Sequence, residues 1–167
     1  VVLLTTLARM SPGAISDVNF TETIFGGDVG DRVTGLAWAP DNTHRLFVIC
    51  QFGQVRVIQN GALLSTPFVT FTPHTSSECG LIGLCFDPDF ATNHYVYFFV
   101  TVSSSEQRII RLDASGNTDT YSSASDDLIT KLPTAGNNHD GGGIGFGRDG
   151  KLYWSIGDLG NGTGVKD

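Results

Sequence analysis

Short runs of apolar residues alternate along this chain with clusters of Gly, Pro, Asn and Asp. The runs are rich in Val, Ile, Phe, Tyr and Thr, a composition typical of β-strands separated by turns. No long segment places apolar residues at the three- and four-residue spacing of an amphipathic helix. The pattern therefore predicts an all-β protein with many short strands.

One seven-residue pattern occurs three times, as GLAWAPD at 35–41, GLCFDPD at 83–89 and GIGFGRD at 143–149. Each copy precedes a second β-like run, and the first two copies are followed by a third and a fourth. These later runs lie at 45–50, 53–61, 67–71, 95–101, 107–116, 126–132 and 151–158. Repeated units of roughly 50 residues with four strands are typical of β-propeller blades.

The predicted fold is a β-propeller of four-stranded antiparallel blades, with an N-terminal extension or signal remnant at 1–20 and a partial propeller at 21–167. The blades are expected at about 33–72 and 80–132, and a third begins at about 139–160. Propellers typically close with four to eight blades, so we expect about two and a half blades of a larger protein. The remaining blades would come from residues outside this sequence, from another chain or from symmetry-related copies.

The composition of the chain narrows the range of functions that it can have. The net charge of -7 and the pI of about 4.8 offer no basic face for nucleic acid. No apolar stretch is long enough to span a bilayer, and a secreted, periplasmic or extracellular location is expected. Asn19 and Asn161 head sequons that matter in a secreted eukaryotic protein. The three cysteines show no zinc-ligand spacing.

The candidate chemistry lies at His139 and Asp158. His139 stands four residues before the third repeat copy, where the earlier copies have Asp31 and Cys79, so we expect these positions to cluster at one end of the central channel. A hairpin turning at 147–150 would return Asp158 to His139. A carboxylate beside an imidazole raises its basicity and fixes its tautomer, as a general base requires.

Other interpretations of these residues stay open. A histidine in a Gly-rich turn is often a surface residue, and Asp158 has the composition of a turn position. Asp140, Asp149 and Asp158 are oxygen ligands of the kind calcium prefers, but they lack the alternation of a calcium loop. The glycines of GGGIGFG also suit a crowded inner strand, independently of any ligand.

Three segments resemble the soluble quinoprotein glucose dehydrogenase and sorbosone dehydrogenase family. ECGLIGLCFDPDFATNHYVYFFVT is similar to that family's Gly-Leu-Leu-Gly-Leu-Ala-Phe-x-Pro-Asp-Phe segment, and NHDGGGIGFGRDGKLYWSIGD is similar to its His-Asn-x-Gly…Gly-Asp segment. GQVRVIQNG resembles a turn and strand of its first blade. The resemblance extends over about residues 20 to 164.

The resemblance implies a six-bladed propeller that oxidises the anomeric carbon of an aldose sugar. It implies pyrroloquinoline quinone (PQQ) as hydride acceptor and calcium as a second cofactor, with most ligands of both outside this chain. His139 matches the family's catalytic base beside the cofactor, Asp158 the carboxylate that orients it, and Glu78 a Gln or Glu near the sugar. No metal ligand is assigned within this chain.

Two departures from the family favour a second hypothesis, a non-catalytic secreted propeller that binds or scaffolds a partner. Gly143 stands where the family often has Arg, and Asp140 replaces the usual Asn or Gln after the histidine. Asp140 would add negative charge near an anionic cofactor. A calcium-dependent lactonase-type hydrolase is a third hypothesis, since propellers also host that chemistry.

Overall fold

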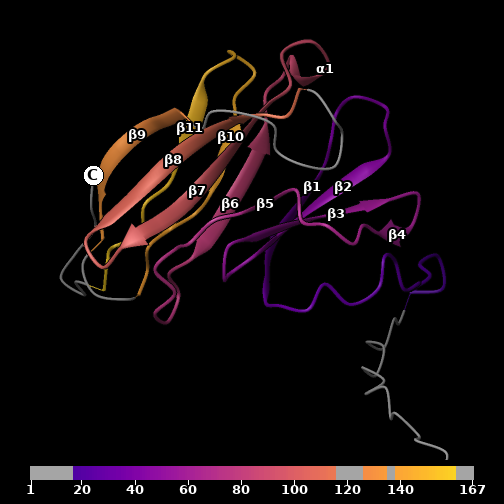
Figure 1. Cartoon of the computed structure of the whole chain (residues 1–167), viewed down its shortest axis with the longest axis horizontal. Helices are drawn as coiled ribbons and strands as arrows, with labels where there is room; N and C mark the ends of the chain where they lie inside the picture. The colour runs from indigo at the N-terminus through magenta and orange to yellow at the C-terminus, as the bar shows by residue number, and fades with distance from the viewer. Residues whose placement is uncertain (1–16, 116–125, 135–137, 161–167) are drawn as a thin grey trace, which may run out of the picture.

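The computed structural model describes residues 17–115, 126–134 and 138–160, and the regular elements in these residues are all β-strands except for one four-residue helix (Figure 1). The all-β prediction is therefore confirmed. Residues 1–16 of the predicted N-terminal extension lie outside the described residues. The elements are β1 Val33–Trp38, β2 Arg45–Cys50, β3 Gln54–Gln59, β4 Ala62–Leu63, β5 Val69–Thr70, β6 Leu81–Phe86, α1 Phe90–Asn93, β7 Tyr95–Ser103, β8 Glu106–Asp113, β9 Asp126–Pro133, β10 Ile144–Phe146 and β11 Leu152–Trp154.

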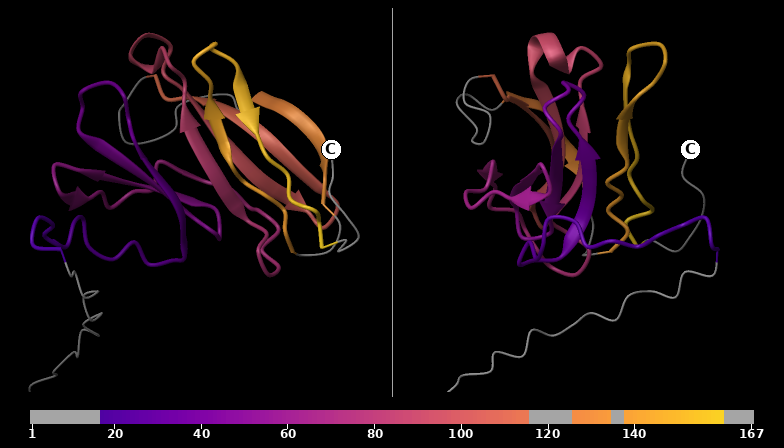
Figure 2. Two further views of the ribbon diagram at one scale, coloured as in Figure 1. Left: turned by 180° about the vertical axis from the view of Figure 1, so that it is seen from behind. Right: turned by 90° about the vertical axis from the view of Figure 1, so that its right-hand side faces the viewer.

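The strands form three antiparallel sheets in chain order. The first has the order β1-β2-β3-β4 with β5 also on β3, the second is β6-β7-β8-β9, and the third is the β10-β11 hairpin. Each sheet winds outward from its first strand, as the blades of a propeller do. Figure 2 shows the yellow β10–β11 hairpin standing beside the earlier sheets.

The fourth strand of the first sheet differs from the single run expected at 67–71. It is divided into β4, which pairs with the end of β3, and β5, which pairs with its beginning. Pro67 lies between the two pieces and cannot donate a hydrogen bond to a sheet. The outer edge of this blade is therefore interrupted.

Side-chain alternation along the central strands builds the core between the sheets. Phe98 and its alternate neighbours on β7 pack against Phe47 and Ile49 of β2, whereas Tyr97 and Phe99 face the β10–β11 hairpin. Successive residues of a strand point to opposite faces, so β7 covers a neighbour on each side. The sheets are thus joined by two apolar seams.

The first strands of the three sheets, β1, β6 and β10, are the inner strands, and glycine lets β6 and β10 approach closely. A Cβ on Gly83 would lie 2.2 Å from the carbonyl oxygen of Gly142. Gly142 has φ +109°, and its Cβ would lie 2.7 Å from the carbonyl oxygen of Ile82. Gly145, by contrast, has open space around it, so crowding explains only part of the glycine-rich sequence.

Large apolar side chains remain exposed at both ends of this stack of sheets. Leu36 and Trp38 of β1 are 62% and 52% exposed, and Tyr153 and Trp154 of β11 are 54% and 41% exposed. Phe25 covers part of the first face, with its ring 5.8 Å from that of Trp38. In the part of the chain that the structure describes, no helix has the length and apolar character needed to cross a membrane.

Candidate active site

His139 and Asp158 face each other beside the β10–β11 hairpin. His139 precedes β10 and Asp158 follows β11, so the antiparallel pairing of these strands brings the two residues together. The imidazole Nδ1 lies 2.6 Å from the Asp158 Oδ1, and the two side chains are 56% and 39% exposed. The predicted proximity of His139 and Asp158 is therefore observed, and a solute can reach the pair.

The backbone of His139 is held in an uncommon conformation. Its φ is +58°, in the left-handed region that non-glycine residues rarely occupy. The amide of His139 donates to the Glu78 Oε2 at 2.6 Å, and its carbonyl accepts from the Leu159 amide at 3.4 Å. Gly157 also approaches closely, since a Cβ there would lie 1.9 Å from the His139 oxygen. These contacts fix the position of the His139 backbone, from which the imidazole projects.

Asp158 and Glu78 make the imidazole more basic. The hydrogen bond to Asp158 raises the pKa of His139 above its ordinary value, and the charges of Asp158 and Glu78 act in the same direction. The Gly160 amide donates to the Asp158 Oδ1 at 2.9 Å and orients that carboxylate. When Nδ1 donates its hydrogen to Asp158, Nε2 carries the lone pair that can accept a proton.

The repeat-equivalent positions Asp31, Cys79 and His139 are connected by hydrogen bonds. Gln51 lies between the first two, and Glu78, which precedes Cys79, accepts from the His139 amide. The Asp31 carboxylate accepts from the Phe52 amide at 3.2 Å, directly after Gln51. Gln51 Nε2 donates to the Cys79 carbonyl at 2.9 Å and to the Ser77 carbonyl at 2.6 Å. The expected clustering at one end of the inner strands is thus a hydrogen-bonded network.

Sequence reasoning missed several members of this network. Gln51 accepts from the Arg32 guanidinium at 3.1 Å, and the Ser77 hydroxyl donates to Asn138 at 2.8 Å. Asn138 and Ser77 are each adjacent to a predicted site residue, and that proximity is the one signal that pointed to them. Gln51 had no such signal, because it is a polar residue in a turn after an apolar strand.

Asp140, which is expected from the sequence to add negative charge near a cofactor, is buried in the structure. Its side chain is 2% exposed and accepts hydrogen bonds from Cys79 and Thr134 in the interior. Although the two residues are adjacent in this loop, His139 is exposed to solvent and Asp140 is buried. The departure from the family pattern at this position therefore lies in the buried residues behind the site and not on its solvent-exposed side.

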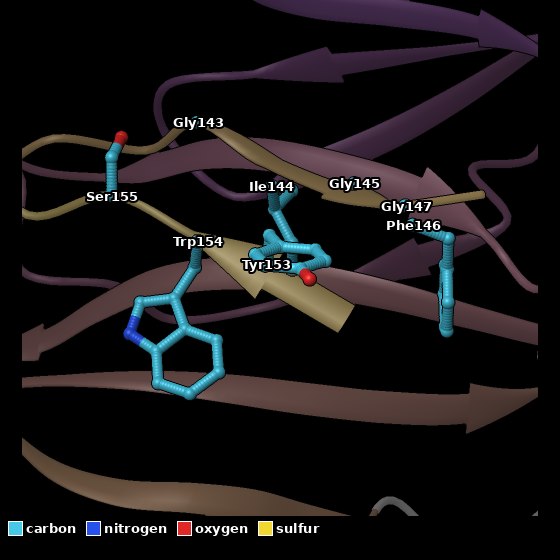
Figure 3. A pocket seen from close by; sticks show the side chains of 8 residues that line it. All are labelled: Gly143, Ile144, Gly145, Phe146, Gly147, Tyr153, Trp154 and Ser155. Carbon is cyan, nitrogen blue, oxygen red and sulfur yellow. The ribbon is translucent and has the colours of Figure 1, made fainter. Parts of the chain in front are cut away.

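A hollow of about 360 Å³ lies on the β10–β11 hairpin and not around the His139–Asp158 pair (Figure 3). Its lining runs from Gly143 and Ser155, at the end nearest the pair, to Gly147 and Tyr153. The lining is mostly apolar and includes none of the site carboxylates. We place the candidate chemistry at the pair, since proton transfer needs titratable groups.

The two predicted glycosylation sites are Asn19 and Asn161. Asn19 is exposed, and Asn161 lies outside the described residues. Within 17–115, 126–134 and 138–160, no three His, Cys, Asp or Glu residues lie close enough together to hold a metal ion. The three cysteines are free thiols. Glycosylation and the roles of His139, Asp158 and Glu78 stay predictions.

The fold and this site define a class: part of a β-propeller with an imidazole–carboxylate pair beside the hairpin that begins its third sheet. Comparison with known proteins narrows the class. The profile of the glucose/sorbosone dehydrogenase family matches residues 31–167, most of the chain. The chain therefore belongs to the glucose/sorbosone dehydrogenase family.

Individual relatives agree with this assignment. The chain is 31% identical to quinoprotein glucose dehydrogenase B of Acinetobacter calcoaceticus over 136 residues, which cover 75% of this chain and 28% of that protein. The PQQ-bound aldose sugar dehydrogenase of Streptomyces coelicolor superposes with a TM-score of 0.71 at 28% identity, covering 84% of this chain and 41% of that one.

A third comparison supports the fold alone. The apo-form of the soluble aldose sugar dehydrogenase of Escherichia coli superposes with a TM-score of 0.66 at 23% identity, covering 78% of this chain and 39% of that one. The chain thus spans less than half the length of each of these relatives.

Proposed function

We propose that the whole protein to which this chain belongs oxidises the anomeric carbon of an aldose sugar, with PQQ as hydride acceptor and His139 as general base. The observation that carries the proposal is the 2.6 Å contact between His139 Nδ1 and Asp158 Oδ1 on a solvent-accessible face. Membership of the glucose/sorbosone dehydrogenase family supports it. Glu78, which holds the His139 amide, is the proposed sugar-contacting residue.

The chemistry assigned to this chain is proton removal. His139 Nε2 takes the proton of the anomeric hydroxyl while the C1–H bond breaks and its electron pair leaves as hydride, so that the sugar becomes a lactone. PQQ, when bound, supplies the electrophilic carbon that accepts this hydride. Asp158 keeps Nδ1 protonated and stabilises the imidazolium that forms.

The charges around the pair fit the sugar side of such a site. Glu78 and Asp158 present carboxylates, which suit sugar hydroxyl groups. PQQ carries carboxylates itself, and Arg32 is the cation that the described network brings to this end of the inner strands. We therefore infer that further cationic PQQ contacts, and any calcium ligands, come from the remaining blades.

Those blades would also cover the apolar faces at the two ends of the stack, such as Trp38 and Trp154. A secreted or periplasmic location of this sugar dehydrogenase is part of the same proposal. The test of location is fractionation of the native host with an antibody against the protein. Detection in the cytoplasm alone would contradict it.

The activity is tested on the full-length protein loaded with PQQ and Ca²⁺, with aldoses as substrates and reduction of an artificial dye as the readout. His139→Asn removes the base while keeping a residue that tolerates positive φ. His44→Asn is the matched control, because His44 is also exposed and has φ +55°. We expect His139→Asn to lose at least about 10²-fold in kcat and the control to keep wild-type turnover.

Two results would contradict the proposal. Unchanged turnover in His139→Asn would show that this imidazole is not the base. If the wild-type protein bound no PQQ, measured by equilibrium dialysis, the alternative of a non-catalytic binding propeller would hold instead.

A further inference from the structure

The Asp140 side chain is buried at the seam between the second sheet and the β10–β11 hairpin. Its side chain is 2% exposed. Oδ2 accepts from the Cys79 Sγ at 2.8 Å, and Oδ1 accepts from the Thr134 hydroxyl at 2.5 Å. A carboxylate removed from water needs such donors, so the two contacts fix the position of Asp140.

Cys79 is itself held rigidly. It is fully buried, its amide donates to the Ser76 carbonyl at 3.0 Å, and its carbonyl accepts from Gln51. Burial raises the pKa of the Cys79 thiol to about 12, and the hydrogen bond with Asp140 acts in the same direction. The thiol therefore stays protonated and donates a hydrogen bond to the Asp140 carboxyl group.

The adjacent residue is His139, whose imidazole gains little from packing because 56% of the side chain is exposed. The direction of the ring then depends on its hydrogen bond to Asp158 and on the backbone from which it projects, which holds φ +58°. A non-glycine residue keeps a left-handed backbone conformation only where several surrounding contacts hold it there. Glu78 fixes the amide before the His139 Cα, and Asp140 is the anchor immediately after it.

We propose that Asp140, tethered to Cys79 and Thr134, is a positioning residue that holds the His139 imidazole against Asp158. The inference rests on the proposed function insofar as His139 is the base. The tether crosses from the loop before β6 to the loop before β10, so it couples the site to the packing of neighbouring blades.

The test compares Cys79→Ala, which deletes the donor, with Cys79→Ser, which keeps one, in the full-length protein. Neither change alters charge, because the thiol is protonated. The readout is an NMR titration of isotope-labelled histidines, with the His139 signal assigned by its loss in His139→Asn. Asp158 and Glu78, the groups that raise the pKa of His139, are untouched.

In Cys79→Ala we expect the pKa of His139 to fall toward the ordinary histidine value, as the ring leaves Asp158. We expect kcat to fall about tenfold, because small misplacements of a reacting group are costly, with KM within about twofold. Cys79→Ser should keep the raised pKa. Cys85→Ala, a half-buried cysteine on β6, is the matched control and should also leave the pKa unchanged.

A folded Cys79→Ala protein with an unchanged His139 pKa would overturn the proposal. If that variant fails to fold, Thr134→Val removes the other donor to Asp140 and is judged by the same titration. The titration does not depend on turnover. An active His139→Asn enzyme would therefore refute the proposed base, whereas the NMR result alone decides the tether.

Discussion

Gly142 offers a sharp test of how closely the inner strands approach. In Gly142→Ala the new Cβ would lie 2.7 Å from the Ile82 carbonyl oxygen and 3.1 Å from the Ile82 Cβ, at φ +109°. Strain at such a φ costs about 1–3 kcal/mol, and overpacking against backbone costs about 1–3 kcal/mol more. We therefore expect the free energy of unfolding to fall by roughly 2–6 kcal/mol.

The matched control is Gly150→Ala in the β10–β11 turn. Gly150 also has a positive φ, +74°, but nothing lies within 4 Å of its added Cβ. It should therefore lose only the strain component, about 1–2 kcal/mol. Guanidinium unfolding of the full-length protein, followed by circular dichroism, measures both losses. Equal losses for the two variants would refute the crowding between β6 and β10.

Three further changes test other parts of the structure. Asp158→Asn removes the carboxylate that raises the pKa of His139, so the acid limb of the pH profile of kcat/KM should move to lower pH; an unmoved limb would contradict the pairing. Phe98→Ala, at a fully buried ring, should cost about 3–5 kcal/mol in urea unfolding, and a loss below about 1 kcal/mol would contradict the assigned core. Asp41→Ala removes the carboxylate that lies 2.7 Å from the guanidinium of Arg45, itself 3% exposed, and should cost about 3 kcal/mol. Burial alone would raise the pKa of Asp41, but hydrogen bonds from Thr43 and Arg45 hold it below its usual value. The wild type should therefore lose the stability contributed by the ion pair as the pH falls through this lowered pKa. An Asp41→Ala variant with the acid sensitivity of the wild type would argue against the pair.

The architecture could be predicted because each blade repeats a local pattern. The three Gly-initiated heptapeptides mark the inner strands β1, β6 and β10, and the apolar runs after them form the paired strands. Even a detail repeats, since β1 and β6 change register at equivalent glycines, Gly35 and Gly83. The approach of His139 and Asp158 was predictable for the same reason, because one hairpin joins them.

The supporting network could not be predicted, because its contacts cross between sheets. Cys79 and Asp140 are 61 positions apart, as are Glu78 and His139. Alternation along a strand tells which face a side chain takes, but not which residue of the next blade it meets. A charged residue beside three glycines also has the composition of an exposed turn, so the burial of Asp140 had no sequence signal.

The seams between sheets explain why structure and chemistry share residues here. Close approach of the inner strands leaves backbone groups at their ends that need polar partners, and Gln51 and Glu78 supply them across the seam. Glu78 also holds the backbone from which the His139 imidazole projects. Blade packing and the position of the base are therefore not independent, and substitutions that loosen the seam should lower activity before they unfold the protein.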